Sequence, residues 1–225
     1  MSDFYVKAQQ QSVARATDGQ WTALRATRDG APIVLPWFQA LVFEGRCFNI
    51  TGPEFVTVEY TGMTLLALAS FGDDDATIYA DIPDGTAGIP LAISHHFKAT
   101  GAAISHVLAF VSDTLLGSGG TETACTIRNL RRDSPVASAA TAAHTATSET
   151  DHVTGAEVVL YTWHTDADID ATADFGSNFY WNANSNTVTP VVLDGGSISL
   201  NMAPTTSGTG FANMTWAELP ESAFT

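Results

Sequence analysis

The sequence predicts an all-β protein in which two antiparallel sheets pack as a sandwich, and three observations support this prediction. Short apolar runs with the two-residue period of strands recur along the chain. Turn residues separate these runs, and no helix of consequence is expected. The 225 residues fit one large all-β domain, and 45% hydrophobic residues are enough for its core.

Residues 1–20 predict an N-terminal arm rather than a part of the sandwich. This stretch is rich in amides and only lightly apolar, and nothing in it caps or sustains a helix. We therefore expect an arm at 1–20, ordered only against another surface, and a single sandwich domain at 21–225.

Apolar stretches between residues 20 and 71 predict the first strands of the sandwich. The stretch 32–43 contains Pro36 and therefore suits an edge strand or a bend between the sheets. The stretch 63–71 is continuously apolar, which predicts a strand buried on both faces. The other expected strands of this part are 20–27, 46–50 and 54–61.

The stretch 77–112 has the clearest strand pattern, with three apolar runs of alternating faces. The turn Pro83-Asp84-Gly85 separates the first two runs, because Pro presets φ and Gly accepts a positive φ. Two antiparallel connections in a row predict a β-meander. In the second run Ile89, Leu91 and Ile93 share one face, and in the third run one face holds Ile104, His106, Leu108 and Phe110.

The C-terminal part predicts further strands and one long loop. Asp194-Gly195-Gly196, between two apolar runs, predicts a hairpin. Residues 134–154 are rich in Ala, Ser and Thr without a period of two, which predicts a long surface loop. The expected total is nine to eleven strands, for which a jelly roll is the commonest arrangement. The stretches of this part in which strands are expected are 123–130, 155–165, the block 179–204 with its hairpin, and 210–219.

Charge is scarce and unevenly spread. Charged residues make up only 15% of the chain, and such a neutral surface suits wide protein–protein contact or an extracellular domain with Ser/Thr-rich loops. The net charge is −15, and all nine Lys and Arg residues lie at or before Arg132. We therefore expect no strong nucleic-acid binding, since phosphates are neutralised by cations.

Cys47 and Cys125 each lie in an apolar run and are expected to be unbridged, buried thiols. No apolar run reaches the length of a transmembrane helix, so no transmembrane segment is expected. The N-terminus also lacks the charged and apolar regions of a signal peptide. The sequons Asn49-Ile50-Thr51 and Asn213-Met214-Thr215 are therefore interpreted as chance matches.

An acidic run provides the one candidate cofactor site, for calcium. Asp166, Asp168 and Asp170 form an Asp-x-Asp-x-Asp pattern that can present oxygens to this ion, and Asp73–Asp75 can do the same. The alternative in both places is a solvated acidic loop. The run lacks the mid-loop Gly and the terminal Glu of an EF-hand, so a helical calcium site is excluded.

The remaining polar and aromatic groups predict no catalysis. Gly117-Ser118-Gly119-Gly120 lacks the aspartate that precedes the serine of serine proteases, and we expect no enzyme. His95 and His96 face opposite sides of a strand, so a cross-strand polar pair with His106 is expected rather than a zinc site. Aromatic residues that suit either a sugar platform or the core are Trp163, Tyr180 and Trp181.

An expected bent N-terminal strand and three later segments, in this order, resemble single jelly-roll capsid proteins of bacterial viruses. The three segments are the turn IPDGTAGIPLAI, the strand AISHVLAFVS and the closing GTGFANMTWAELP, in the order in which strands and loops occur in that family. The resemblance implies a non-enzymatic shell subunit in the virion, whose partners are copies of itself and other virion proteins. It implies assembly through loops and the N-terminal arm. The chain departs from small-virus capsid proteins in lacking a strongly basic arm.

Two other functions fit the same sequence. A trimeric receptor-binding or decoration domain of a phage is also acidic and rich in Ser/Thr/Gly loops. A carbohydrate-binding module needs an exposed row of aromatic residues and often calcium.

Overall fold

The computed structural model describes ten stretches of the chain: 37–53, 62–70, 75–99, 105–117, 120–147, 157–164, 177–183, 189–192, 194–205 and 208–223. Within them the helical elements are α1 (Trp37–Phe43), η1 (Leu68–Ser70) and η3 (Glu221–Ala223). The strands are β1 (Cys47–Gly52), β2 (Met63–Leu65), β3 (Ala76–Ile82), β4 (Thr86–Ala99), β5 (Ser105–Ser112), β6 (Thr121–Ala124), β7 (Arg128–Asn129), β8 (Thr141–Thr147), β9 (Val158–His164), β10 (Ser177–Asn182), β11 (Gly196–Pro204) and β12 (Gly208–Pro220).

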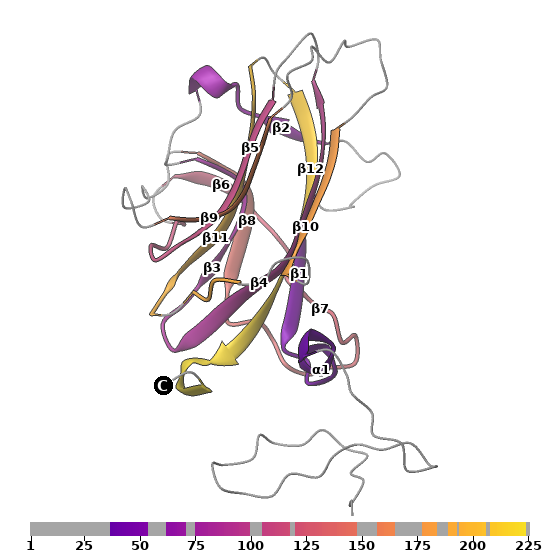
Figure 1. The fold of residues 1–225 in the computed structure, drawn as a ribbon, viewed down its shortest axis with the longest axis vertical. Helices are drawn as coiled ribbons and strands as arrows, with labels where there is room; N and C mark the ends of the chain where they lie inside the picture. Colours follow the sequence, from indigo (N-terminus) through magenta and orange to yellow (C-terminus); the bar gives the residue numbers. More distant parts are fainter. Residues whose placement is uncertain are drawn as a thin grey trace, which may run out of the picture.

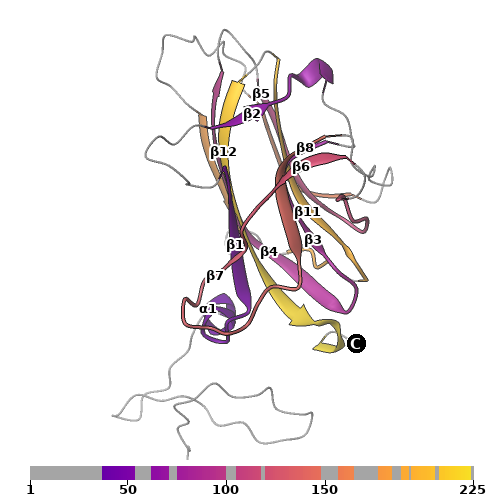
Figure 2. The same ribbon diagram turned by 180° about the vertical axis from the view of Figure 1, so that it is seen from behind.

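The strands form two antiparallel sheets that pack face to face, which confirms the predicted sandwich (Figure 1, and from behind Figure 2). One sheet has the order β10-β4-β12-β1-β7, with β2 paired to β12, and the other has the order β6-β8-β3-β11-β5-β9. The described strands number twelve, one more than the upper limit expected from the sequence.

Eight of these strands have the pairing of a jelly roll. Strands of the first half of the chain pair with strands of the second half in reverse order: β1 with β12, β3 with β11, β4 with β10 and β5 with β9. The chain is thus one long antiparallel ribbon, folded so that successive strand pairs alternate between the sheets. The strands β2, β6, β7 and β8 are additions to this framework.

This pairing shows that the predicted β-meander is wrong. The strands β3, β4 and β5 follow one another in the chain, but β3 and β5 lie in one sheet and β4 lies in the other. The turn itself is as predicted, since Thr86 N donates to Pro83 O at 3.2 Å and Gly85 has a φ of 78°. Alternation along a strand defines its two faces but not its neighbours, so the sequence pattern cannot identify a crossing between sheets.

A β-bulge at Leu91 corrects the predicted faces of β4. Trp216 lies opposite Pro90 and Thr215 lies opposite Ala92, so Leu91 is an extra residue in the strand. Ile89 therefore packs on the outer face of the sheet, whereas Ile93 packs in the core between the sheets. The prediction that these side chains share one face is wrong for Ile93.

Two apolar stretches near the N-terminus were also predicted with the wrong structure. Residues 37–43 form α1 instead of an edge strand or a bend, and of the stretch 63–71 only Met63–Leu65 forms a strand. Thr64 is exposed, so β2 is buried on one face and not on both. Short apolar runs do not distinguish a strand from a helix, which explains both errors. The expected strands 20–27 and 54–61 and the arm at 1–20 lie outside the described residues.

The predicted long loop 134–154 contains a strand. Thr141–Thr147 forms β8, which pairs with β3 on one side and β6 on the other. Its buried residues are the small Ala142, Ala143 and Ala146, and Thr145 has a positive φ of 54° that interrupts the alternation. Alanine gives little apolar contrast with threonine, so the two-residue period is hidden in the sequence.

The predicted hairpin at Asp194–Gly196 is a turn without a hairpin. Asp194 and Gly195 have positive φ values of 56° and 82°, as the turn residues suggest. However, Val192 forms a bridge with Gly88, and β11 pairs with β3 and β5. The chain before the turn therefore joins the opposite sheet.

Buried side chains form a main core between the sheets and two smaller clusters, one under α1 and one on β3 and β8 that contains Tyr79 and Leu116. The main core contains Phe48, Ile78, Ile198, Met214 and Trp216, among others. On β5, Val107, Ala109 and Val111 face this core while His106 is exposed, which confirms the predicted alternation of that strand. The cluster under α1, called the α1 cluster below, consists of Leu41, Cys47, Ala87, Ile89, Ala217 and Leu219.

Candidate interaction surface

The α1 helix and the segment after β7 build one corner of the sandwich, the α1–β7 corner, which comprises residues 37–46 and 128–136. The helix packs on the outer face of the β4-β12-β1 sheet through Leu41 and, partly, Val42. Both views of the ribbon place α1 and β7 together at the same end of the molecule (Figures 1 and 2). This corner is therefore attached to the sandwich by its own set of apolar contacts.

Gly45 ends the helix and fixes the chain beside it. Its φ is 71°, and its N–H donates to Val42 O at 3.0 Å while the Arg46 N–H donates to Leu41 O at 2.9 Å. These bonds satisfy the last carbonyls of the helix, as a left-handed C-terminal cap does. A Cβ at Gly45 would lie 2.2 Å from Ser134 Oγ, so close contact with the 128–136 segment also requires glycine.

Side chains of the 128–136 segment hold the helix end from the other side. Arg131 Nη1 donates to Phe43 O at 2.8 Å, and Asn129 Nδ2 donates to Gly45 O at 2.8 Å and to Val136 O at 2.9 Å. A cation at a helix C-terminus is also favoured by the helix dipole. Arg131 Nε donates to Asp133 Oδ1 at 3.0 Å, and this bond keeps the pKa of Asp133 below its usual range.

The α1–β7 corner exposes large apolar side chains beside arginines. Trp37 is 49% exposed, Phe43 47% and Leu130 41%, although a tryptophan and a phenylalanine favour burial. Arg128 lies opposite Asn49 at the sheet edge, and both Arg128 and Arg132 are exposed. Aromatic and arginine side chains together are the composition of protein–protein contact sites.

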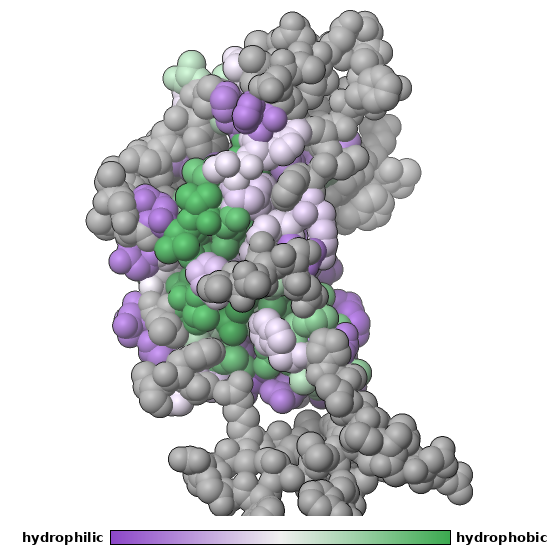
Figure 3. Space-filling model, viewed as in Figure 1, coloured by the Kyte–Doolittle hydropathy of each residue, from purple (hydrophilic) through white to green (hydrophobic). Residues whose placement is uncertain are grey.

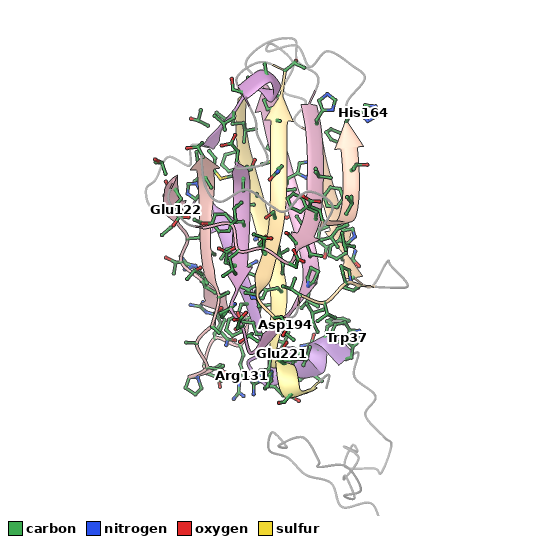
Figure 4. All side chains as sticks on the ribbon, turned by 90° about the vertical axis from the view of Figure 1, so that its left-hand side faces the viewer. Trp37, Glu122, Arg131, His164, Asp194 and Glu221 are labelled. Carbon is green, nitrogen blue, oxygen red and sulfur yellow. The ribbon has the colours of Figure 1, made fainter. Side chains whose placement is uncertain are left out.

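Four acidic residues gather at a second corner, the acidic corner, formed by Asp84, Asp113, Asp194 and Glu221. They come from the β3–β4 turn, the end of β5, the turn before β11 and the end of β12. Asp194 N donates to Glu221 Oε1 at 3.1 Å and Glu221 N donates to Gly85 O at 3.2 Å. Gly195 is so close to Asp84 that a Cβ there would lie 2.6 Å from its Oδ1. Figure 4 places Asp194 and Glu221 at the same end of the sandwich as Trp37 and Arg131, with His164 at the opposite end.

The cations of the described chain are concentrated at the first corner. The structure describes five of the nine Lys and Arg residues, and four of the five, Arg46, Arg128, Arg131 and Arg132, belong to the α1–β7 corner. The fifth, Lys98, lies near the far end of β4. In a protein with a net charge of −15, this corner therefore carries a local excess of positive charge, with four arginines against Glu44 and Asp133.

A neutral polar ladder covers the outer face of β1 and β12, next to the same corner. Asn49 Nδ2 donates to Asn213 Oδ1 at 2.6 Å and to Thr215 Oγ1 at 2.9 Å, and Asn213 Nδ2 donates to Thr51 Oγ1 at 3.2 Å. These residues are the two sequon matches, which lie antiparallel so that each asparagine is opposite the threonine of the other. The repeated Asn-x-Thr pattern thus reflects cross-strand hydrogen bonding.

A shallow hollow of about 280 Å³ lies beside this ladder, lined by Thr51, Ser94, His95, His96, Phe211, Ala212 and Asn213. The rings of His96 and Phe211 are 6.1 Å apart between centroids. The hollow therefore offers one aromatic pair and several neutral hydrogen-bonding groups, which suit a small polar ligand such as a sugar unit.

The histidines do not form the predicted pair. His106 stacks on His164 of β9, with ring centroids 6.3 Å apart, whereas His95 points into the sandwich. There His95 Nδ1 is 3.2 Å from Tyr161 Oη. Burial, and secondarily the nearby His96, lowers the pKa of His95 from its usual 6.5 to about 4, and burial raises the pKa of Tyr161. His95 is therefore a neutral group that joins β4 to β9 across the two sheets.

The predicted sugar platform is not formed, because its members lie on different faces. Trp181 is buried in the main core, and Trp163 packs against that core. Tyr180 is 62% exposed on the other face of β10. The core interpretation of the two tryptophans is confirmed.

The predicted calcium residues Asp166, Asp168 and Asp170 lie outside the described part of the chain, as do Asp73, Asp74 and Ser118. Asp75 is described and buried. Among the described residues, no group of three or more His, Cys, Asp or Glu side chains is arranged to hold a metal ion. In the same part of the chain, Cys47 and Cys125 are unbridged, and no helix combines the length and the apolar character needed to cross a membrane.

An apolar area covers the beginning of β9. Val158 and Val159 are each 52% exposed, and Figure 3 shows apolar residues gathered on the face that carries this strand. Within the described sheet β9 pairs only with β5, so it is an edge strand of that sheet.

Comparison of the chain with protein-family models found no match, and comparisons with curated proteins and with solved structures found none either.

Proposed function

We propose that the protein is a non-enzymatic shell subunit of a virion that assembles with copies of itself and with other virion proteins. The observation that carries this proposal is the α1–β7 corner, where Trp37, Phe43 and Leu130 are exposed beside arginines on a corner with its own apolar anchor. A jelly roll serves viral capsids as well as lectins, so the fold alone does not select a function. The exposed corner favours an assembling protein.

A second surface supports the same proposal. The edge of β9 carries Val158 and Val159 without a lysine or proline, the residues that usually prevent strands from pairing between molecules. A subunit that contacts several neighbours needs more than one contact surface, and the corner and the β9 edge supply two.

Light scattering coupled to size exclusion tests the proposal on the full chain. We expect particles or capsomers much larger than one chain, at near-neutral pH and moderate salt. A compact trimer would favour a receptor-binding or decoration domain instead. A monomer at all concentrations and salts would exclude the shell subunit.

The N-terminal arm gives a second test. Residues 1–20 are too polar to bury much surface by themselves, so a partner must offset the entropy lost when they order. A chain without residues 1–20 is expected to keep its circular dichroism spectrum and to assemble more weakly. Equal assembly of both chains would show that the arm has no such role.

The hollow at His96 and Phe211 favours a carbohydrate-binding module as the second candidate. A half-buried ring beside neutral amides and hydroxyls is a composition that sugar recognition uses. Calorimetry with soluble oligosaccharides on the full chain and on the Phe211→Ala variant tests this function. Saturable binding that the substitution abolishes, by a monomeric protein, would place this function first.

A further inference from the structure

We propose that copies of this chain join head to tail, with the α1–β7 corner of one copy against the acidic corner of the next. This inference rests on the proposed self-assembly and names the two surfaces that make one of its contacts. The occupant of the exposed corner is therefore a second copy of this chain.

The separation of charge is the first argument. The α1–β7 corner holds four of the five described cations, and the acidic corner holds four carboxylates, three of them on exposed residues. Complementary charge aligns two surfaces as they approach and excludes misaligned contacts. Neither corner can face its own copy in a second molecule without bringing like charges together.

The position of the two corners is the second argument. They lie at the same end of the sandwich but on different layers, because α1 packs on the outer face of the β4-β12-β1 sheet and three of the four acidic residues adjoin β3, β5 or β11 of the other sheet. Figures 1 and 2 agree, with α1 and β7 on one side and the C-terminal end of the described chain on the other. Contact between two different surfaces repeats from copy to copy and closes into a ring when the rotation permits. A capsomer is such a ring.

Apolar anchors are the third argument. Trp37, Phe43 and Leu130 supply the desolvated centre that a stable contact needs, and the exposed Arg128 and Arg132 supply a charged rim. A contact of standard size buries on the order of 800 Å² on each partner, which is comparable with one end of a domain of this size.

Charge reversal with complementation tests the contact on the full chain. One variant carries Arg128→Glu and Arg132→Glu, and the other carries Asp84→Lys and Asp113→Lys. Each variant alone is expected to lose about tenfold or more in apparent association constant by analytical ultracentrifugation. An equimolar mixture is expected to recover assembly, because the reversed arginine corner of one variant then meets the reversed acidic corner of the other, while the two native corners meet each other. The matched control is Lys98→Glu, at the far end of β4, which should assemble like the wild type. Circular dichroism verifies that every variant is folded.

The outcomes separate this inference from the proposed function. If the wild type assembles and both variants assemble equally well, the head-to-tail contact is wrong. The proposed function as a shell subunit is not affected by that result. If only the arginine variant loses assembly and the aspartate variant is unaffected, the α1–β7 corner binds a surface other than the acidic corner. That result would also overturn the head-to-tail contact. A wild-type chain that never assembles would overturn both.

Discussion

The main core and the α1 cluster share the same strands but join different parts of the molecule. In β12, Trp216 points between the sheets and the next residue, Ala217, points outward under α1. The main core uses large side chains such as Trp216 and Phe48, whereas three of the five side chains on the sheet side of the α1 cluster, Ala87, Cys47 and Ala217, are small. Small side chains let a helix lie close to a sheet, and large ones fill the space between two sheets.

This difference implies that folding and assembly depend on separate contacts. Burial between the sheets determines whether the sandwich exists, because both sheets contribute to it. Burial under α1 determines where Trp37, Phe43 and the nearby arginines are held. Substitutions in the two clusters should therefore have different consequences for stability and for assembly.

The largest effect is expected for Trp216→Ala. Trp216 is fully buried, its ring lies 6.2 Å from that of Phe48, and its Nε1 donates to Glu218 Oε1 at 2.8 Å. Removal of such a side chain costs about 3–5 kcal/mol in free energy of unfolding. Glu218 also loses a donor, although the Ala139 N–H still donates to it at 2.8 Å. Urea unfolding measures the change in the free energy of unfolding. The control is Tyr180→Ala, at an exposed residue, for which this free energy should change by no more than about 0.5 kcal/mol. Equal effects of both substitutions would contradict the assigned core.

A smaller effect on stability, with a larger effect on assembly, is expected for Leu41→Ala. Leu41 is the buried residue of α1, and its loss should cost about 2–3 kcal/mol at most. Because the other contacts of α1 are the half-buried Val42 and hydrogen bonds at its C-terminal end, the helix should loosen while the sandwich remains folded. Hydrogen exchange should then be faster in residues 37–46 but unchanged in β11, and assembly should weaken. Unchanged protection of α1 would show that the helix is held by other contacts.

A pH-dependent effect is expected from His95 in the main core. Because the pKa of His95 is lowered to about 4 in the folded protein, the unfolded chain, with a pKa of 6.5, binds the proton more strongly. The stabilisation is complete above pH 6.5 and is lost as the pH falls toward 4. Between pH 7.5 and pH 5 this amounts to about 2 kcal/mol. The slope of unfolding free energy against pH should become shallower in His95→Gln, whereas the exposed His106→Gln should keep it. A slope unaffected by His95→Gln would assign the acid sensitivity to other groups.

The fold was largely predictable from the sequence because its main signals are local. The turn at 83–85 and the alternating faces of β5 follow from residue types within a few positions of each other. The neighbours of each strand were not predictable in this way, since β3–β11 and β4–β10 pairs connect residues that are far apart in the chain. The bulge at Leu91 depends on the register with β12 and leaves no mark in the local pattern.

The candidate surface was not predicted at all. Trp37 and Phe43 belong to an apolar stretch, and apolar residues are expected to be buried unless the three-dimensional arrangement leaves them exposed. Two signals in the sequence were nevertheless available. Gly45 after an apolar run is a helix stop. The absence of cations after Arg132 limits any positive surface to a few segments, among them the one around Arg128–Arg132.

The smallest change compares the two cysteines, one in each region. Cys47 is fully buried in the α1 cluster, and burial, with a contribution from Glu44, raises its pKa to about 12. Cys125 is half-buried and packs at the margin of the main core. Since the thiolate is the reactive form, an alkylating reagent at pH 8 should label Cys125 first and Cys47 only after unfolding. Peptide mass spectrometry over time measures both rates in one sample.

In the Leu41→Ala variant the labelling of Cys47 should accelerate, because the helix no longer covers it, while the rate at Cys125 stays the same. Equal acceleration at both sites would mean that the α1 cluster and the main core unfold together, and the separation between them would be wrong.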